Sequence, residues 1–296
     1  MFLKMPSTIH SSLKEKALPF SGVLRSYGWR GEEDSRGLAR VVCSHGDYYH
    51  LVCDEASGEI IARKKKSAFM KKDAPLPHTG DFVTFTYNAQ GESMITGILP
   101  RYTVFERKDP SARTKSQVLA VNFDTLFIMM SMNEDFSVER IERYLDLAES
   151  CREAEIVVVL TKMDLFEAGD APLVSELESV IGARAKLLKI SALTGEGVAE
   201  ARTYAQTGRT IAMVGSSGVG KSTLLNTLAG EDIALTQEVQ EWSGKGRHTT
   251  TSRRLFMLKS GAMIIDTPGV REIGRRGENE RFVSRAESAH RWRKKD

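Results

Sequence analysis

One octapeptide constrains the fold of this 296-residue chain more than any other feature. Residues 215–222 have the sequence GSSGVGKS, which matches the pattern G-x-x-x-x-G-K-[ST]. An apolar run at 209–215 precedes the glycines, and a helical pattern begins near Gly220. Between a strand and a helix, such a loop directs backbone N–H groups at phosphate oxygens. We therefore predict a nucleoside triphosphate site at the edge of an α/β sheet.

The octapeptide also assigns individual roles. The Lys221 ammonium is expected to contact the β- and γ-phosphates, and the Ser222 hydroxyl is expected to ligate Mg²⁺. The predicted phosphate-binding residues are Gly215, Ser216, Ser217, Gly218, Val219, Gly220, Lys221, Ser222 and Thr223.

A second apolar run, at 262–266, ends in Asp-Thr-Pro-Gly. Asp266 is predicted to hold a Mg²⁺-bound water, and the Gly269 N–H to face the γ-phosphate. The polar, glycine-punctuated segment 244–251 has the composition of a switch loop, in which Thr250 would complete the Mg²⁺ shell. An ordinary β-turn and a solvated hairpin loop are the alternatives for these two segments.

Base selection is predicted from two further segments. Residues 161–164 are here called the first base loop, and the segment that begins with Ser191 and Ala192 is called the second base loop. Residues 161–164 (TKMD) follow a strand pattern and are similar to the guanine-binding N/T-K-x-D motif, in which the carboxylate accepts from guanine N–H groups. Thr161 stands where asparagine is commoner, which removes an amide and predicts a less ordered pocket. Together the motifs favour GTP over ATP. The predicted base-binding residues are Thr161, Lys162, Met163, Asp164, Ser191 and Ala192.

The order of these motifs is unusual. Near-continuous apolar runs alternate with helical patterns at 137–151, 173–181 and 197–204, which predicts a three-layer α/β domain with a parallel sheet. In ordinary GTPases the phosphate loop precedes the base loops, whereas here it follows them. We therefore predict a circularly permuted P-loop GTPase domain. The expected strands are 124–132, 155–161, 185–191, 209–215 and 262–266.

The N-terminal part has a different pattern, of five short β-like runs separated by turn signals. This predicts a small all-β barrel of the OB-fold type, with an SH3-like barrel as the alternative. The expected strands are 38–44, 47–53, 59–65, 81–87 and 93–99. The expected divisions are an arm with little regular structure (1–36), the barrel (37–105), a linker (106–118), the GTPase domain (119–274) and a basic tail (275–296).

A cluster of cations falls on the third barrel strand and the loop after it. OB-folds bind oligonucleotides with cations for phosphates and aromatic rings for bases, and Tyr48, Tyr49 and Phe69 are candidate rings. A solvated lysine-rich edge that discourages strand aggregation is the alternative. The candidate RNA-binding residues are Arg63, Lys64, Lys65, Lys66, Lys71 and Lys72.

Composition and residue patterning exclude several classes of protein. The net charge of +3 comes from the tail, since residues 275–296 carry eight Lys or Arg against four Asp or Glu. The three cysteines form no C-x-x-C pair, so we predict neither a disulfide framework nor a cysteine-rich zinc site. No apolar run reaches the ~18 residues that a bilayer requires, which predicts a cytoplasmic protein with no membrane partner.

The sequence resembles the bacterial ribosome-small-subunit-dependent GTPase family (RsgA, also called YjeQ). The resemblance covers about residues 37–274 and is most specific in GSSGVGKS and in GRHTTT (246–251). It implies an OB barrel, a permuted GTPase and a C-terminal zinc domain, and binding to the 30S ribosomal subunit near 16S rRNA, with subunit-stimulated hydrolysis. Val270 stands where a glutamine would orient the attacking water, and the resemblance points to His248 for that role. We expect a monomer that uses Mg²⁺ with GTP.

The chain departs from that family after Gly274. The tail contains no cysteine and one histidine, so zinc cannot be assigned, and we expect a truncation or a frame-shifted end in place of the zinc domain. Two further functions therefore stand beside the GTPase. The first is an RNA- or ribosome-binding module that holds guanine nucleotide with little turnover, and the second is an ATP-using P-loop enzyme.

Overall fold

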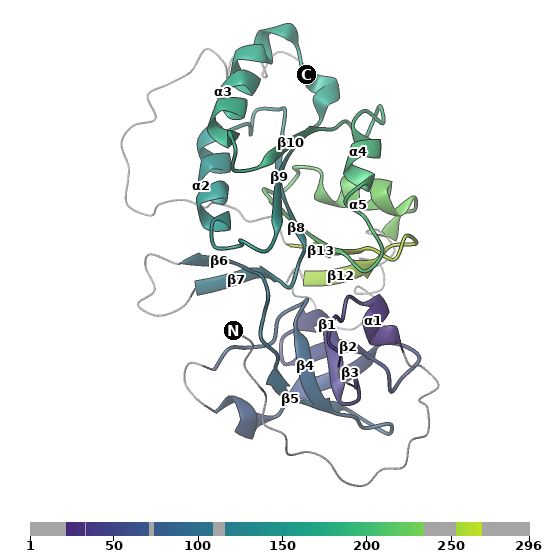
Figure 1. The fold of residues 1–296 in the computed structure, drawn as a ribbon. Helices are drawn as coiled ribbons and strands as arrows, with labels where there is room; N and C mark the ends of the chain where they lie inside the picture. The colour runs from purple at the N-terminus through teal and green to yellow at the C-terminus, as the bar shows by residue number, and fades with distance from the viewer. Residues whose placement is uncertain (1–21, 33, 71–73, 109–115, 234–252, 268–296) are drawn as a thin grey trace.

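Two β-structures are stacked along the long axis of the molecule in the computed structural model (Figure 1). The structure describes residues 22–32, 34–70, 74–108, 116–233 and 253–267. An N-terminal barrel lies at one end, and a sheet covered by helices lies at the other. The chain therefore divides into the two architectures that the sequence predicts.

The N-terminal structure is a closed five-stranded barrel. Its strand order is β1-β2-β3-β5-β4, and β1 pairs with β4 to close it, with β3 and β5 parallel. This is an OB-like barrel, as predicted. Alternate residues such as Tyr49, Leu51 and Ala62 fill its interior. The elements are β1 (Leu38–His45), β2 (Tyr48–Cys53), β3 (Ile60–Lys64), a 3₁₀ turn η1 (Lys66–Phe69), β4 (Phe82–Thr86) and β5 (Ser93–Ile98).

The second structure is a parallel sheet with one antiparallel strand. Its order is β10-β9-β8-β11-β13-β12, and β12 runs antiparallel to β13. The phosphate-loop strand β11 is central, although it follows β8, β9 and β10 in the chain. The strands are β8 (Thr125–Ser131), β9 (Glu155–Thr161), β10 (Lys186–Lys189), β11 (Thr210–Gly215), β12 (Arg253–Met257) and β13 (Met263–Asp266).

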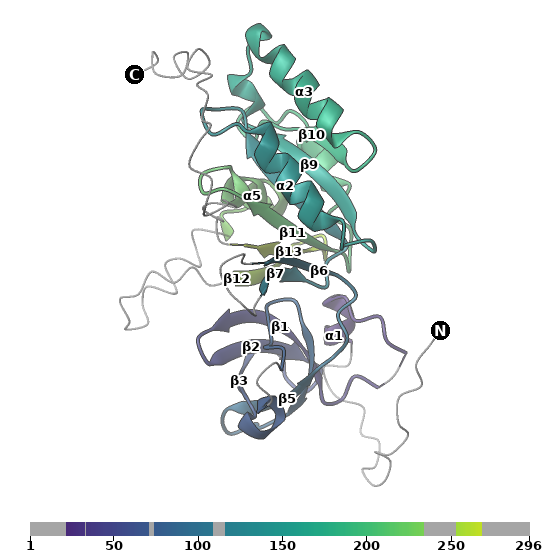
Figure 2. The ribbon, with the colours of Figure 1, turned by 90° about the vertical axis from the view of Figure 1, so that its left-hand side faces the viewer.

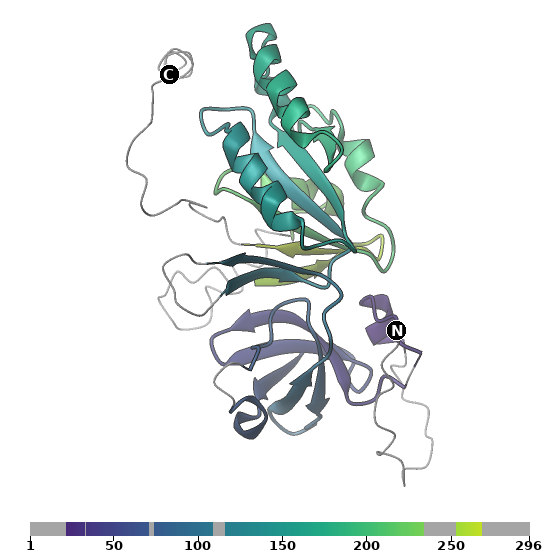
Figure 3. The ribbon, with the colours of Figure 1, turned by 60° about the vertical axis from the view of Figure 1, so that its left-hand side comes forward.

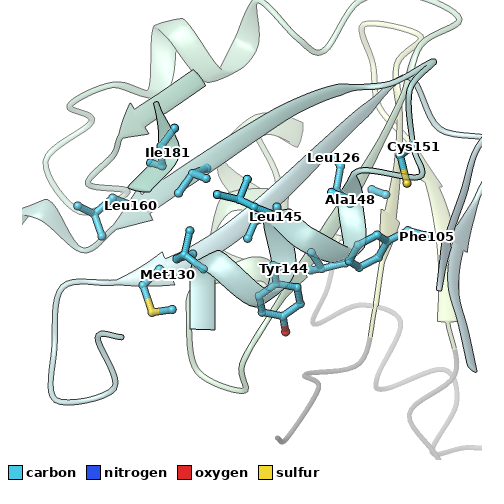
Figure 4. Close-up of a cluster of buried hydrophobic side chains, with 14 of the residues drawn as sticks. Phe105, Leu126, Met130, Tyr144, Leu145, Ala148, Cys151, Leu160 and Ile181 are labelled. Atoms are coloured by element: carbon cyan, nitrogen blue, oxygen red, sulfur yellow. The ribbon is translucent and has the colours of Figure 1, made fainter. Parts of the chain in front are cut away.

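Helices cover both faces of this sheet (Figure 2). Residues of β8 alternate between the two cores, since Leu126, Ile128 and Met130 pack beneath α2 and α3 while Phe127 and Met129 pack beneath α4 and α5. Figure 4 shows the first core, in which Tyr144 of α2 stacks on Phe105 with ring centroids 6.4 Å apart. The helices are α2 (Val138–Ala148), α3 (Ala171–Ile181), α4 (Val198–Arg202) and α5 (Lys221–Ala229), with short turns η2 (Met163–Leu165) and η3 (Ala168–Asp170).

Strand β12 joins the barrel to the GTPase sheet. It pairs with β13 on one side and with β1 on the other, where Cys43 is opposite Arg254, so that one eleven-stranded sheet runs through both structures. Arg254 also forms an ion pair with Glu59 of the barrel, and Leu255 packs against Val42 of β1. The two structures are thus connected by a ladder, an ion pair and an apolar contact.

A fully buried arginine lies at the same junction. The Arg40 side chain is 0% exposed, and its guanidinium lies 4.9 Å from the ring centroid of Phe82. Its guanidinium N–H groups donate to oxygens from the N-terminal arm, the barrel, the connecting segment and strand β11. These acceptors are the carbonyls of Tyr27, Gly80 and Asn122 and the Thr210 hydroxyl. Burial lowers the pKa of Arg40, and the fan of acceptors compensates the charge.

Four elements differ from the sequence prediction. The expected linker 106–118 contains ends of a β-hairpin, β6 (Val104–Lys108) with β7 (Ser116–Val121), which lies between the two structures (Figure 3). Strand β12 was not predicted, and the expected arm contains a helical turn, α1 (Val23–Ser26), that buries Leu24. No helix in the described part of the chain is long and apolar enough to cross a bilayer.

Candidate functional site

The predicted nucleotide-binding segments meet at one edge of the sheet. Strands β9, β10, β11 and β13 are parallel, so their carboxyl ends lie at the same edge. Thr161, Gly215 and Asp266 are the last residues of three of these strands. Ligands of open α/β sheets bind in the crevice outside the carboxyl ends of the strands. The structure therefore brings the base loops and the phosphate loop to one candidate pocket.

The phosphate loop turns sharply from β11 into α5. Gly220 has φ of +99°, a left-handed conformation that L side chains rarely adopt, and helix α5 begins at the next residue. Ser222 and Thr223 lie exposed in the first helical turn, whereas Lys221 is only 8% exposed. The Lys221 ammonium donates to the carbonyls of Gly215 (3.1 Å) and Ser216 (2.8 Å). Its charge is therefore held inside the loop, where burial lowers its pKa.

Asp266 faces the same loop from the end of β13. The Oδ1 atom of Asp266 is buried and makes no hydrogen bond among the described residues. Burial raises the pKa of this carboxyl to about 6, and Lys221 opposes the shift. The next residue, Thr267, donates its hydroxyl to the Met213 carbonyl at 2.7 Å and ties β13 to β11. The Asp266 carboxylate, which ends β13, and the exposed Ser222 hydroxyl, which follows β11, are hard oxygen donors of the kind that Mg²⁺ prefers, so these residues fit the ion.

Thr161 links a base loop to the phosphate loop. Its hydroxyl donates to the Val219 carbonyl at 2.7 Å and lies 3.2 Å from the Met130 carbonyl. The hydroxyl therefore joins the end of β9 to the phosphate loop itself. No sequence signal predicts this contact, since its two partners are 58 residues apart.

The next residue of the same loop is held in an uncommon conformation. Lys162 has φ of +58°, which costs a non-glycine residue about 1 kcal/mol or more. The Met163 N–H donates to the Ile190 carbonyl at 3.2 Å, so the first base loop is fixed to the strand that leads into the second. The sequence did not predict this left-handed backbone conformation, which follows directly on the end of strand β9 at Thr161.

The second base loop fixes the carboxylate that would bind guanine. Ser191 is fully buried, and its hydroxyl donates to Asp164 Oδ1 at 2.6 Å while it accepts from the Thr194 N–H at 3.2 Å. Gly197, at the end of the loop, packs so closely that a Cβ would lie 2.0 Å from the Lys189 carbonyl. Asp164 itself remains exposed. The sequence analysis did not single out Leu193 of the same loop, whose apolar side chain is 83% exposed.

Several predicted residues lie outside the described part of the chain. They are His248, Thr250, Gly269, Lys71 and Lys72, together with the tail 275–296. In the described part, no group of three or more His, Cys, Asp or Glu side chains could hold a metal ion, and all three cysteines are free and buried.

The barrel cations divide into two kinds. The Arg63 Nε lies 2.7 Å from Glu92 Oε2, and the Lys64 ammonium lies 3.7 Å from Asp47 Oδ1. Lys65 and Lys66 are exposed, and neither has an ion-pair partner among the described residues.

The three aromatic rings proposed for base stacking also differ in their exposure to solvent. Tyr49 is 4% exposed inside the barrel and Phe69 packs against the same core, so the prediction that Tyr49 stacks on a base is wrong. Alternation along β2 explains this result, because adjacent residues point to opposite faces of a strand. Tyr48 is 39% exposed and remains available.

This fold and site define a class: a P-loop guanine-nucleotide-binding domain in circularly permuted order, attached to an OB-like barrel. The chain belongs to the RsgA GTPase family, whose sequence profile matches residues 98–276. A Lactiplantibacillus plantarum protein named small ribosomal subunit biogenesis GTPase RsgA 2 is 40% identical over 82% of this chain and 68% of its own length. A Methanosarcina acetivorans protein named small ribosomal subunit biogenesis GTPase RsgA is 37% identical over 76% of this chain and 60% of its own length.

Solved structures agree with the family. The structure of YjeQ from Thermotoga maritima is 27% identical, with a TM-score of 0.57 over 78% of this chain and 74% of that one. YloQ, described as a circularly permuted GTPase, is similar in fold with a TM-score of 0.51 over 80% of this chain and 72% of that one. The chain thus spans roughly two thirds of the length of such relatives.

Proposed function

We propose that this protein is a GTPase of small-subunit maturation, which binds the 30S subunit through 16S rRNA and hydrolyses GTP to GDP and phosphate when the subunit stimulates it. The observation that carries the proposal is the convergence of Asp164, Lys221 and Asp266 at one sheet edge. The relatives named for small ribosomal subunit biogenesis support the partner. We place the protein in the cytoplasm as a monomer.

Each described residue has a specific task in the bound state. Asp164, already oriented by Ser191, accepts from the N1–H and exocyclic amine of guanine. The Lys221 ammonium exchanges its two carbonyl acceptors for the β- and γ-phosphate oxygens. Ser222 and Asp266 would hold Mg²⁺, Asp266 through a water, and the ion would neutralise phosphate charge. Thr250 and the Gly269 N–H complete this set.

Hydrolysis also needs a group that orients the attacking water. Val270, after the Asp-Thr-Pro-Gly turn, can neither donate nor accept. We assign the role to His248, whose imidazole can do both. A His248→Ala protein would keep its GTP affinity and lose most of its subunit-stimulated turnover. Unchanged stimulated turnover would remove His248 from the mechanism.

The barrel supplies the RNA contact in this proposal. Arg63, Lys64, Lys65 and Lys66 line β3 and the turn after it, and Lys71 and Lys72 follow in the sequence. Strands 2 and 3 of an OB-fold are its usual oligonucleotide-binding face.

GTP hydrolysis with and without purified 30S subunits tests the function. Strong stimulation by 30S, and none by 50S subunits as the matched control, is the expected result. Subunit binding without any turnover would instead support the RNA-binding module with bound guanine nucleotide. Preferential ATP binding would contradict the assignment of Asp164 to guanine.

A further inference from the structure

Two side chains on the outer face of the barrel form a flat stack. Tyr48 of β2 is directly opposite Arg63 of β3, and directly opposed residues of antiparallel strands share a face. The Arg63 guanidinium carbon lies 4.2 Å from the Tyr48 ring centroid, and an Arg63 N–H donates to the Tyr48 hydroxyl. The guanidinium therefore lies over the Tyr48 ring on the outer face of the barrel.

The charge of this arginine is already compensated. Glu92, which precedes β5, approaches the Arg63 Nε to 2.7 Å, yet the Nε–H makes no hydrogen bond. A phosphate would have to compete with this carboxylate for the cation. The planar face of the guanidinium has no such competitor, and the Arg63 side chain is 43% exposed.

The neighbouring surface is apolar on one side and cationic on the other. Ile61 lies two residues before Arg63 in β3, on the same outer face, and is 49% exposed. Lys65 and Lys66 follow β3 and are exposed, with no ion pair in the part of the chain that is described. A planar stack, an apolar neighbour and two unpaired cations match the chemistry of one unpaired nucleobase with adjacent phosphates.

We propose that Tyr48 and Arg63 form a stacking platform for one unpaired nucleobase of single-stranded RNA, with Lys65 and Lys66 on the flanking phosphates. This inference rests on the proposed RNA-binding function and names the subsite that distinguishes single strands from duplexes. Bases in an RNA duplex are stacked on each other, so the platform has nothing to bind there.

The test measures binding of a fluorescein-labelled, eight-nucleotide, mixed-sequence RNA to the full chain over a range of salt concentrations. Tyr48→Leu lowers affinity about ten-fold with an unchanged salt dependence, because stacking releases no counterions. Arg63→Lys keeps the charge and lowers affinity about five-fold, again with an unchanged slope. The matched control Lys66→Ala lowers affinity about three-fold and reduces the slope by about one.

A direct readout is available from Tyr48→Trp. Single-stranded RNA should quench the fluorescence of this new tryptophan, and a blunt duplex of the same sequence should not. Thermal unfolding of each variant verifies that the barrel is intact.

Two results overturn the inference while leaving RNA binding in place. One is wild-type affinity in Tyr48→Leu, and the other is a reduced salt slope in Arg63→Lys, which would make Arg63 a phosphate contact. Absence of RNA binding by the wild-type chain would overturn both the inference and the RNA-binding part of the proposed function.

Discussion

The two ends of the nucleotide pocket are stabilised differently. At the base end, neutral hydroxyl groups of Thr161 and Ser191 fix the loops, and the nearest carboxylate, Asp164, is hydrogen-bonded. At the phosphate end, Lys221 is buried against carbonyl groups of its own loop, and Asp266 has an oxygen that finds no partner among the residues the structure describes. Burial moves the pKa of Lys221 down and that of Asp266 up, toward the neutral form of each.

This difference indicates where ligand binding and protein stability compete. The base end is preorganised, so a bound base adds hydrogen bonds without displacing any described ones. The phosphate end carries the buried side chains of Lys221 and Asp266, for which we propose phosphate and Mg²⁺ as partners, and these charges would lower stability until the ligand arrives. Substitution of Asp164 should therefore affect binding alone, whereas loss of a charge at the phosphate end should weaken binding without a matching loss of stability.

The largest expected effect comes from Lys221→Met. Loss of the ammonium removes charge-assisted hydrogen bonds to phosphate, so GTP affinity should fall about a thousand-fold. The free energy of unfolding without nucleotide should change by less than about 1 kcal/mol, because the variant also loses the cost of burying a charge. Calorimetric titration and urea unfolding measure the two quantities. A large loss of stability without nucleotide would contradict the proposed competition.

Asp164→Asn is the corresponding change at the base end. The amide places a donor where the carboxylate accepted, so GTP affinity should fall about a hundred-fold and xanthosine triphosphate should become the better ligand. Competition between the two nucleotides measures the switch. Asp170→Asn, at another carboxylate of the same connection, is the control and should retain guanine preference. Retained GTP preference in Asp164→Asn would break the assignment of this end of the pocket.

Thr161→Val tests the link between the two ends. It leaves the Val219 carbonyl without its hydroxyl donor, which costs about 1–2 kcal/mol, so GTP affinity should fall about ten-fold. Thr161→Ser retains the hydroxyl and serves as the matched variant, with affinity close to wild type. Wild-type affinity in Thr161→Val would show that this hydrogen bond does not contribute to binding.

The last expected effect concerns the stability of the nucleotide-free protein rather than nucleotide binding. The pKa of Asp266 is raised from 3.8 to about 6, so the folded state favours the protonated carboxyl and loses stability as pH rises from 3.8 to about 6. Asp266→Asn should therefore stabilise the protein by about 3 kcal/mol at pH 7.5 and have little effect at pH 4. Urea unfolding at both pH values, without Mg²⁺, measures this. Destabilisation at pH 7.5 would mean that the carboxylate already has a partner.

Residues whose chemistry is local could be predicted from sequence. The parallel strands appear as near-continuous apolar runs because both of their faces are buried, and the motif residues were found because they follow those runs. Even the OB-like closure of the barrel follows from five short runs and their turns.

Residues whose partners are distant in sequence could not be predicted. Arg40 lies in an otherwise apolar strand, and nothing local indicates that four separate segments supply its acceptors. Strand β12 begins with two arginines, and their polar side chains make the segment look unlike a buried strand in the sequence. In the structure this strand pairs with β1 and joins the barrel to the GTPase sheet. The hairpin β6–β7 was assigned to a linker because the polar segment between its strands dominates the local composition.

The pairing of β1 with β12 has a consequence for biosynthesis. Every ladder within the barrel joins strands between residues 38 and 98, so the barrel can close early on the emerging chain. Cys43 can pair with Arg254 only after about two hundred further residues have been synthesised. Strand β8 likewise can pair with β11 only after the residues of β11 have been synthesised. Contacts of such sequence separation form slowly, and nascent chains fold from the N-terminus. A nascent chain would therefore complete its barrel before the sheet that contains β8 and β11, and the phosphate loop would be positioned last.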